Sequence, residues 1–328
     1  MKVIIIGYGS IGKRHTKNLL SKSKHDIIIQ SKQNNVKLID KNRCKSFDSL
    51  KKCLDYKPDV GLVTNVSSEH VKTALQLANV GCHLFIEKPL SNSLTDTKKL
   101  LNITKKKKLV TLMGCNLRFH PCIKKIKEII SKNEIGKIIS VRVECGTYLP
   151  EWHPSENYKT SYASNQKLGG GVVLTCIHEL DYLYWFFGQV KEVFSMTGRY
   201  SNLGIDADDL SAIILKFKNN IIAEVHLDFF QRPDFRSCKI IGTKGTIYWD
   251  SSNNEVKVYN IKKNKWIKKL KIKNYDKNKE YVDELLHFLQ CVEKKKKTLN
   301  DLTQGIETLK IALGIIKSSK EKKIIKIK

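Results

Sequence analysis

The chain has 328 residues, 41% of them hydrophobic, and carries a formal net charge of +28. This length exceeds that of one compact core and predicts two domains, and the hydrophobic content excludes a disordered protein. No apolar run approaches the roughly 20 residues that span a bilayer, which excludes a helical membrane protein.

Positive charge is spread along the whole sequence, with Lys clusters at residues 105–108 and 294–297 near expected helix ends. Cations there suit the negative end of a helix dipole, whereas a nucleic-acid-binding protein gathers Lys and Arg on one face. We therefore expect no nucleic-acid partner and no membrane partner, and expect the overall field to attract anionic substrates. A basic nucleic-acid binder is the alternative, which a salt titration against duplex DNA would reveal.

The nine cysteines are scattered and form no CxxC pair. This pattern argues against a zinc site or a disulfide framework and for reduced thiols. A strand begins directly at Lys2, so we expect no signal peptide ahead of it and a cytoplasmic location.

The first 30 residues read as strand, glycine turn, helix and strand. Residues 3–6 and 27–29 are short apolar runs typical of buried strands, and residues 13–20 suit a helix. This arrangement is the start of an open, doubly wound α/β fold.

The turn after the first strand reads Gly7-Tyr8-Gly9-Ser10-Ile11-Gly12. Gly7 suits the tight turn, Gly9 lets a pyrophosphate reach the backbone, and Gly12 allows close packing of helix on strand. The helix N-terminus then offers N–H groups and partial positive charge to the phosphates. A dinucleotide site is therefore predicted, its contacts being the three glycines with Ser10 and Ile11.

The second strand ends Gln30-Ser31-Lys32, without the carboxylate that usually holds the ribose 2′-OH of NAD. A hydroxyl and a cation suit a 2′-phosphate better. Ser31 and Lys32 are therefore predicted cofactor contacts, and NADP is favoured over NAD. The alternative is that both residues lie in a solvated loop and that another residue binds the ribose.

Further apolar runs at residues 59–63, 83–86 and 109–113 continue the parallel sheet. Ser67 is expected to cap a helix that runs to about residue 80, and Ser91 or Ser93 to open another. The third of these strands is followed by Asn116, where the alternation of strand and helix stops.

The run at residues 83–86 delivers Glu87-Lys88-Pro89 to the carboxyl edge of the sheet, where open α/β folds place their chemistry. Lys88 is predicted to lie where a nicotinamide ring and a substrate hydroxyl meet. From these residues alone, a surface Lys in a strand-to-helix turn is the alternative.

The second half alternates apolar and polar residues at strand lengths, which predicts a large open antiparallel sheet in an α+β domain. The expected strands are residues 137–147, 190–199, 208–218, 221–230, 236–242 and 245–250, and the expected helices are residues 171–187, 280–292 and 302–316. We predict a dinucleotide-binding Rossmann domain over residues 1–118 and a substrate-binding and oligomerisation domain over residues 119–328.

Groups of residues spread over most of the chain match the pattern of one family. They are Gly7-Tyr8-Gly9-Ser10-Ile11-Gly12 with His15, Thr64-Asn65 with His70, Glu87-Lys88-Pro89, Asn116-Leu117-Arg118-Phe119-His120-Pro121, Gly169-Gly170-Gly171 with His178 and Asp181, Leu227-Asp228 with Arg232-Pro233, and residues 242–246. In this order and spacing they resemble the glucose–fructose oxidoreductase / inositol dehydrogenase / rhizopine-catabolism (Gfo/Idh/MocA) family of NAD(P)-dependent oxidoreductases. The resemblance implies a Rossmann domain followed by an α/β domain whose open sheet often forms dimer or tetramer contacts.

The resemblance also implies a catalytic set, namely the Lys of the Glu-Lys-Pro motif with an Asp and a His after the glycine triplet. Lys88 and His178 carry over. The Asp does not, because Thr175 stands about where it is expected, with Leu174 beside it. Asp181 matches a recurrent family residue that is more often structural. The family implies the remaining cofactor residues, which are Thr64, Asn65, His70, Glu87 and Lys88 itself.

The expected chemistry is hydride transfer with proton handling by the protein. His178 would take the hydroxyl proton, since its pKa suits this near neutrality. Lys88 as an ammonium would stabilise the developing negative charge, and Glu87 would help to set its charge state. The family commonly has a cis Lys-Pro bond, so a cis bond is expected at Lys88–Pro89. The alternative for His178 is a core histidine.

Substrate contacts are expected from residues at the start of the second domain and from a polar-aromatic loop before the glycine triplet. Aromatic faces suit a sugar ring, the alternative being a loop that packs on its own aromatics. The candidates are Arg118, His120, Tyr148, Trp152, His153, Tyr158, Tyr162 and Asp181.

Residues 148–188 resemble a subgroup associated with bacterial surface-glycan and nonulosonic-acid sugar pathways, which implies a sugar or nucleotide-sugar substrate. The predicted function is an NAD(P)-dependent sugar oxidoreductase with no metal, acting as a homodimer or homotetramer. The missing Asp motivates the alternative of a cofactor-binding sensor or assembly protein without catalysis.

Overall fold

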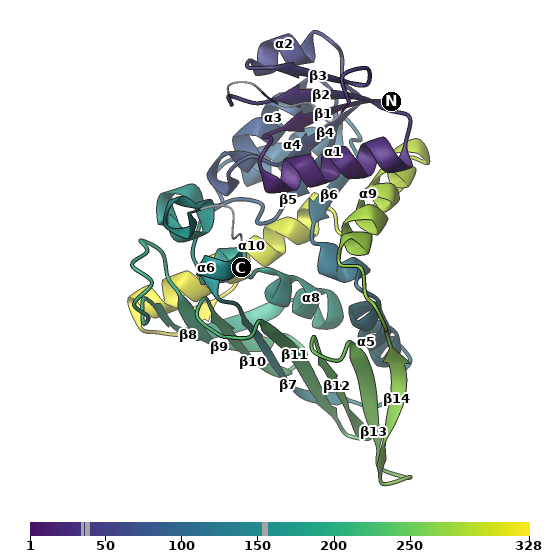
Figure 1. Cartoon of the computed structure of the whole chain (residues 1–328). Helices are drawn as coiled ribbons and strands as arrows, with labels where there is room; N and C mark the ends of the chain where they lie inside the picture. Colours follow the sequence, from purple (N-terminus) through teal and green to yellow (C-terminus); the bar gives the residue numbers. More distant parts are fainter. Residues whose placement is uncertain (34–35, 37–39, 153–156) are drawn as a thin grey trace. The chain divides into compact units, whose positions relative to one another are not determined.

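The computed structural model in Figure 1 describes residues 1–33, 36, 40–152 and 157–328. They form two compact units: unit 1 is Met1–Asn116 with Asn278–Leu309, and unit 2 is Leu117–Lys277 with Lys310–Lys328. The sequence predicts one division, at residue 118. In the structure, residues 278–309 instead belong to the same compact unit as residues 1–116.

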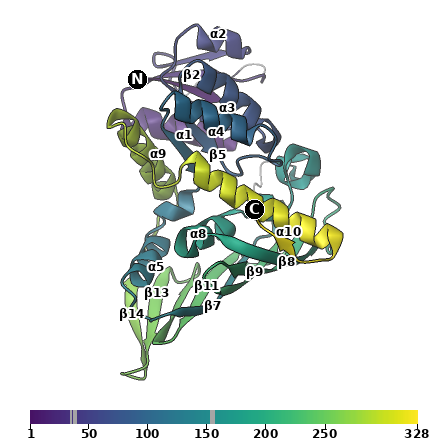
Figure 2. The same cartoon turned by 180° about the vertical axis from the view of Figure 1, so that it is seen from behind.

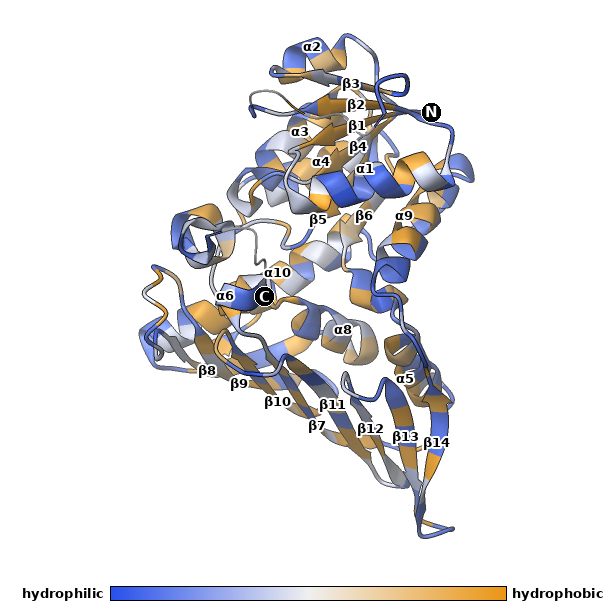
Figure 3. Cartoon of the chain, in the orientation of Figure 1, coloured by the Kyte–Doolittle hydropathy of each residue, from blue (hydrophilic) through white to orange (hydrophobic). Residues whose placement is uncertain are grey.

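Unit 1 is built on a parallel six-stranded sheet in the order β3-β2-β1-β4-β5-β6. Its strands are β1 (Lys2–Ile6), β2 (Asp26–Gln30), β3 (Cys44–Phe47), β4 (Val60–Val63), β5 (His83–Glu87) and β6 (Thr111–Gly114). The central strands are apolar on both faces, as expected for a parallel sheet covered by helices. Figure 3 shows them as the most hydrophobic strands of this unit.

Helices cover both faces of this sheet. Figure 1 shows α1 (Ser10–Lys22) and α9 (Asn278–Glu293) on one face, and Figure 2 shows α3 (His70–Asn79) and α4 (Thr97–Lys106) on the other. The short helix α2 (Leu50–Leu54) follows β3.

Helix α9 belongs to unit 1 because its apolar side is part of the same core. Leu285, Phe288, Leu289 and Val292 follow helical spacing and are all buried with residues of β1, β2 and β5. The rings of Phe85 and Phe288 meet edge to face with centroids 5.7 Å apart. A helix nearly 200 positions beyond β5 thus completes the Rossmann core.

Unit 2 is built on a nine-stranded sheet in the order β14-β13-β12-β11-β7-β10-β9-β8-β15. Neighbouring strands are antiparallel except β7 and β10, which run parallel. The strands are β7 (Ile138–Gly146), β8 (Val190–Gly198), β9 (Leu210–Phe217), β10 (Ile222–Asp228), β11 (Phe235–Gly242), β12 (Gly245–Asp250), β13 (Glu255–Asn260), β14 (Lys265–Lys271) and β15 (Ile325–Lys326). The predicted fold class, a Rossmann sheet followed by a large open sheet, is confirmed.

The helices of unit 2 include α5 (Pro121–Ser131), α6 (Leu149–Trp152), α7 (Val172–Thr175) and α8 (His178–Phe187), and α10 (Leu302–Glu321) spans the end of unit 1 and the last part of unit 2. Figure 1 shows α5 and α8 on the same face of the sheet. The other face carries exposed apolar residues, among them Phe194, Met196 and Ile214.

Several local predictions need correction. The helix predicted over residues 171–187 is broken into α7 and α8, because Cys176 leaves helical geometry at φ −90° and ψ 34°. Helix α4 begins at Thr97 after a left-handed Asp96, so neither Ser91 nor Ser93 opens it. Ser67 lies inside a 3₁₀ turn, and the N-cap residue of α3 is Glu69 instead.

Strands β13 and β14 and helix α5 were not predicted. β14 reads Lys-Trp-Ile-Lys-Lys-Leu-Lys, and its four lysines interrupt the alternation of apolar and polar residues that is typical of a strand. The expected cis bond at Lys88–Pro89 is confirmed, and Arg232–Pro233 is also cis. Within the described residues, no helix is both long and apolar enough to cross a membrane.

Candidate active site

The glycine turn of unit 1 has the geometry that a dinucleotide phosphate needs. Gly7 has φ +95°, and a Cβ on it would lie 2.7 Å from the backbone N of Asn65. A Cβ on Gly12 would lie 2.2 Å from the carbonyl oxygen of Gly7, so the first turn of α1 packs directly on the loop. A Cβ on Gly9 would meet nothing within 4 Å. The backbone at Gly9 therefore faces open space at the start of a helix, where an anion is favoured.

The loop after β4 is tied to the glycine turn and to the loop after β5. The Thr64 hydroxyl donates to the carbonyl oxygens of Ile6 at 3.0 Å and Gly7 at 2.8 Å. The ring nitrogens of His70 lie 2.8 Å from the carbonyl oxygen of Pro89 and 2.9 Å from that of Asn65. Burial lowers the pKa of His70. Thr64, Asn65 and His70 are thus brought together around the predicted cofactor edge, and direct contact of each with a cofactor stays a prediction.

Glu87 is held beside Lys88 by a buried hydrogen-bond network. The Nε2 of His15 lies 2.7 Å from Glu87 Oε1, and the backbone N–H of Lys88 donates to Glu87 Oε2 at 3.3 Å. Gly114 leaves room for this carboxylate, since a Cβ there would lie 2.9 Å from it. The network fixes the end of β5 from which the Lys88 side chain starts.

Helix α9 adds Tyr281 to the surroundings of this network, which the sequence did not predict. The guanidinium of Arg14 lies 4.4 Å from the centre of the Tyr281 ring, and the ring of His15 lies 6.4 Å from it. Burial raises the pKa of Tyr281, and the charges of Arg14, Glu87 and Lys88 all act on its hydroxyl. No local signal marks residue 281, because its proximity comes from the packing of α9.

The loop after β2 presents the two predicted ribose contacts in different ways. Ser31 is buried, and its hydroxyl accepts a hydrogen bond from the backbone N–H of Gln33 at 3.1 Å. Lys32 is exposed. The Lys32 side chain is therefore open to solvent beside Ser31, and the contact of either residue with a cofactor stays a prediction.

In unit 2, Arg118 and Asp181 form a buried ion pair. Arg118 Nε and Nη2 donate to the two carboxylate oxygens of Asp181 at 2.7 and 2.9 Å, and both side chains are at most 2% exposed. The Trp185 ring also packs against the guanidinium. This bidentate pair fixes the first turn of α8. A contact of either residue with substrate stays a prediction.

Thr175 and His178 lie on the two sides of the break between α7 and α8. Thr175 ends α7 and is 2% exposed, whereas His178 begins α8 and is 8% exposed. The glycine triplet upstream packs tightly, since a Cβ on Gly170 would lie 2.3 Å from the carbonyl oxygen of Tyr162. The triplet thus joins the segment of His178 to the predicted aromatic loop.

His120 has a structural environment. Its Nδ1 accepts a hydrogen bond from the backbone N–H of Cys122 at 3.1 Å, which caps α5. The ring lies between Trp249 and Tyr275, and burial lowers its pKa to about 4. His120 is therefore a neutral cap at physiological pH, and its predicted contact with substrate stays untested.

The predicted aromatic loop is only partly described, because His153 lies outside the described residues. The guanidinium of Arg232 lies 3.4 Å from the centre of the Tyr148 ring. Trp152 ends α6, and Tyr162 begins a short 3₁₀ turn. The Tyr158 hydroxyl donates to the carbonyl oxygen of Leu203 at 3.1 Å.

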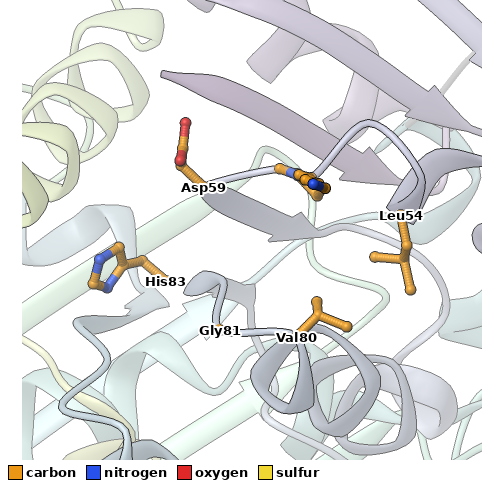
Figure 4. A pocket seen from close by; sticks show the side chains of 7 residues that line it. Leu54, Asp59, Val80, Gly81 and His83 are labelled. Atoms are coloured by element: carbon orange, nitrogen blue, oxygen red, sulfur yellow. The ribbon is translucent and has the colours of Figure 1, made fainter.

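In unit 1, a pocket lies at the amino ends of the strands of the parallel sheet (Figure 4). Its lining includes Asp59 before β4, His83 at the start of β5, and Leu54, Val80 and Gly81. Because these residues are at the amino ends of the strands, the pocket is separate from the glycine turn at the carboxyl ends.

A Rossmann unit with an open glycine turn and a Lys at the end of β5, joined in one chain to a large open-sheet unit, defines a two-unit nucleotide-binding oxidoreductase. Residues 1–115 match the oxidoreductase family domain described as an NAD-binding Rossmann fold, and residues 127–327 match its C-terminal alpha/beta domain. The chain belongs to this family, Gfo/Idh/MocA, and the predicted resemblance is confirmed.

Relatives of the chain include proteins named as dehydrogenases. The chain is 27% identical to myo-inositol 2-dehydrogenase of Thermotoga maritima, over 76% of this chain and 75% of that protein. It is also 27% identical to levoglucosan dehydrogenase of Pseudarthrobacter phenanthrenivorans, over 59% of this chain and 56% of that protein. A levoglucosan dehydrogenase structure in complex with NADH has the same fold, with a TM-score of 0.89 and 17% identity over 100% of this chain and 99% of that one.

Proposed function

We propose that the chain is an NAD(P)-dependent dehydrogenase that transfers hydride between a nicotinamide and a CH–OH group or ketone of a sugar or cyclic polyol. The observation that carries the proposal is the open glycine turn of a Rossmann unit with Lys88 at the end of β5, anchored by the His15–Glu87 pair. The named activities of the relatives, on inositol and levoglucosan, support the substrate class.

Gly7, Gly9, Ser10, Ile11 and Gly12 would hold the diphosphate of the cofactor, which supplies the hydride acceptor. The Lys88 ammonium would hydrogen-bond the substrate oxygen and stabilise its negative charge. His178 would take the hydroxyl proton. Thr175 stands where the family has an Asp, and its hydroxyl can exchange hydrogen bonds but carries no charge.

A finer proposal concerns the substrate. The net charge of +28 favours an anionic sugar, such as a nucleotide sugar. Together with the resemblance of residues 148–188, this supports a place in bacterial surface-glycan biosynthesis.

The experiment is an assay of the purified chain with NAD and NADP against inositols, anhydrosugars, free hexoses and nucleotide sugars. We expect turnover with at least one sugar or polyol, lost in His178→Asn. If the protein binds cofactor but oxidises no member of the panel, the second candidate gains. That candidate is a cofactor-binding sensor or assembly protein, and the Thr at position 175 is the observation that favours it.

Cofactor preference gives a separate prediction. Lys32 is exposed beside the buried Ser31, so we expect the KM for NADP to be below that for NAD. Lys32→Ala should raise the KM for NADP by roughly tenfold and leave that for NAD within about twofold, since one charge-assisted hydrogen bond is worth about 1.5–3 kcal/mol. A lower KM for NAD in the parent protein would contradict the preference.

We also propose a homodimer or homotetramer in the cytoplasm. The exposed apolar residues on one face of β8 and β9, namely Phe194, Met196 and Ile214, support contact with a second copy. The described cysteines are all free, which suits a reducing compartment.

A further inference from the structure

Two buried acids follow His178 in the first turn of α8. Glu179 is 0% exposed and Asp181 is 1% exposed. A helix N-terminus favours negative charge, but a carboxylate in the interior is costly to desolvate and also needs a cation beside it. The structure supplies an arginine to each acid, from two distant parts of the chain.

The two ion pairs hold the turn from different sides. Asp181 is paired with Arg118, which precedes α5, and Glu179 is paired with Arg236, the second residue of β11. Arg236 Nε lies 2.6 Å from Glu179 Oε1, and the Arg236 side chain is 27% exposed. Residues two positions apart in an α-helix point about 200° apart around its axis. Arginines bound to both acids therefore restrain rotation of the turn.

Arg236 is itself held on the sheet, at its backbone and at its guanidinium. Its backbone N–H donates to the Ser251 hydroxyl at 2.9 Å, and its carbonyl oxygen accepts from the Ser251 N–H at 2.8 Å. Arg236 and Cys145 of β7 are cross-strand partners, and Arg236 Nη2 donates to Cys145 Sγ at 3.3 Å. The guanidinium thus has a fixed place on the sheet, and Glu179 is tied to that place.

The last turn of α8 is held as well. Lys127 Nζ, on α5, donates to the carbonyl oxygen of Trp185 at 2.8 Å. With its far end fixed, the direction of the helix start depends on the pairs of the first turn. His178 begins α8 directly before Glu179, so the ion pair of Glu179 fixes the backbone from which the imidazole starts.

We propose that Arg236 is a positioning residue for His178, the base of the proposed reaction. Its ion pair with Glu179 sets the orientation of the first turn of α8 and, through it, the place of the imidazole. This inference rests on the proposed function, because it concerns the proton acceptor of that reaction. The contacts that carry it all lie within unit 2.

The experiment compares Arg236→Met and Arg236→Lys with the parent chain. In steady-state kinetics, Arg236→Met should lower kcat by roughly ten- to a hundredfold, since a misplacement of about 1 Å can cost about a hundredfold in rate. The KM for the cofactor should stay within about twofold, because the glycine turn belongs to unit 1. Arg236→Lys keeps a cation beside Glu179 and should recover part of the lost kcat.

A second readout follows His178 without turnover. In NMR spectra of the chain with 13C-labelled histidine, the His178 signal is assigned by its absence in His178→Asn. This signal should shift in Arg236→Met and return toward its parent position in Arg236→Lys.

Arg142→Met is the matched control. Arg142 forms an ion pair of 2.8 Å with Glu224 in the same sheet. It lies three positions before Cys145 on β7, so its side chain is on the opposite face from the partner of Arg236. This variant should change neither kcat nor the His178 signal.

The double variant Arg236→Met/Glu179→Leu separates positioning from stability. It should be more stable than Arg236→Met, because both charges of the pair are removed. It should nevertheless keep the low kcat and the shifted His178 signal, and parent-like values of both would overturn the proposal. If the parent chain oxidises no substrate, the proposed function fails, and the NMR comparison alone still decides whether Arg236 positions His178.

Discussion

Lys88→Ala is expected to lower kcat by roughly a thousandfold, while the Kd for the preferred cofactor stays within about threefold of the parent value. The backbone N–H of Lys88 is held by Glu87, and Glu87 is held in turn by the buried His15. Truncating the side chain beyond Cβ leaves these contacts in place. The loss should therefore be that of the ammonium charge on the substrate oxygen, about 4 kcal/mol of transition-state stabilisation.

Steady-state kinetics and cofactor fluorescence titration check this prediction. Lys98→Ala removes an exposed Lys from α4 of the same unit and should leave both kcat and Kd unchanged. Lys88→Arg keeps the charge but spreads it over a larger group, so we expect an intermediate kcat. Full turnover in Lys88→Ala would remove Lys88 from the chemistry.

The parts of unit 1 that the sequence predicts are those that depend on neighbouring residues. The apolar run of β1, the glycine turn and the start of α1 are specified within about 20 positions, and each is a local choice of backbone geometry. The same holds for β5 and Glu87-Lys88-Pro89. The close approach of Gly12 to Gly7 follows from the motif alone.

The contacts that the sequence does not predict join residues far apart in the chain. His15 and Glu87 are 72 positions apart, and Asn116 donates to Glu280 from 164 positions away at 2.9 Å. The apolar spacing of α9 predicts a helix with one buried side, yet a spacing pattern holds no information about which sheet covers it. The placement of residues 278–309 in unit 1 could therefore come only from the structure.

For Arg118 and His120, the sequence does not predict which protein groups each side chain contacts. Both are polar residues beside a family motif, and the sequence predicts that they reach a substrate. In the structure Arg118 is paired with Asp181 and His120 caps α5 between two aromatic rings. Polarity in the sequence indicates that a residue needs a partner, but these protein partners are set by the fold, and a contact of either residue with substrate stays a prediction.

Arg118→Met is expected to destabilise the protein by about 3–5 kcal/mol, because it leaves the Asp181 carboxylate buried without its cation. Both side chains are at most 2% exposed, and the two hydrogen bonds of 2.7 and 2.9 Å are lost together. Asp181 lies in the first turn of α8, so the loss acts on the helix that begins with His178. Urea unfolding followed by Trp fluorescence measures the change.

The exposed pair Arg142–Glu224 provides the matched control, because its 2.8 Å contact joins the same kinds of group with side chains 69% and 49% exposed. Arg142→Met should cost only about 0–1 kcal/mol, since water already screens that pair. The double variant Arg118→Met/Asp181→Leu should recover most of the lost stability, because both charges of the buried pair are then removed. Equal losses for Arg118→Met and Arg142→Met would contradict the assignment, and would mean that Asp181 finds another cation or water when Arg118 is absent.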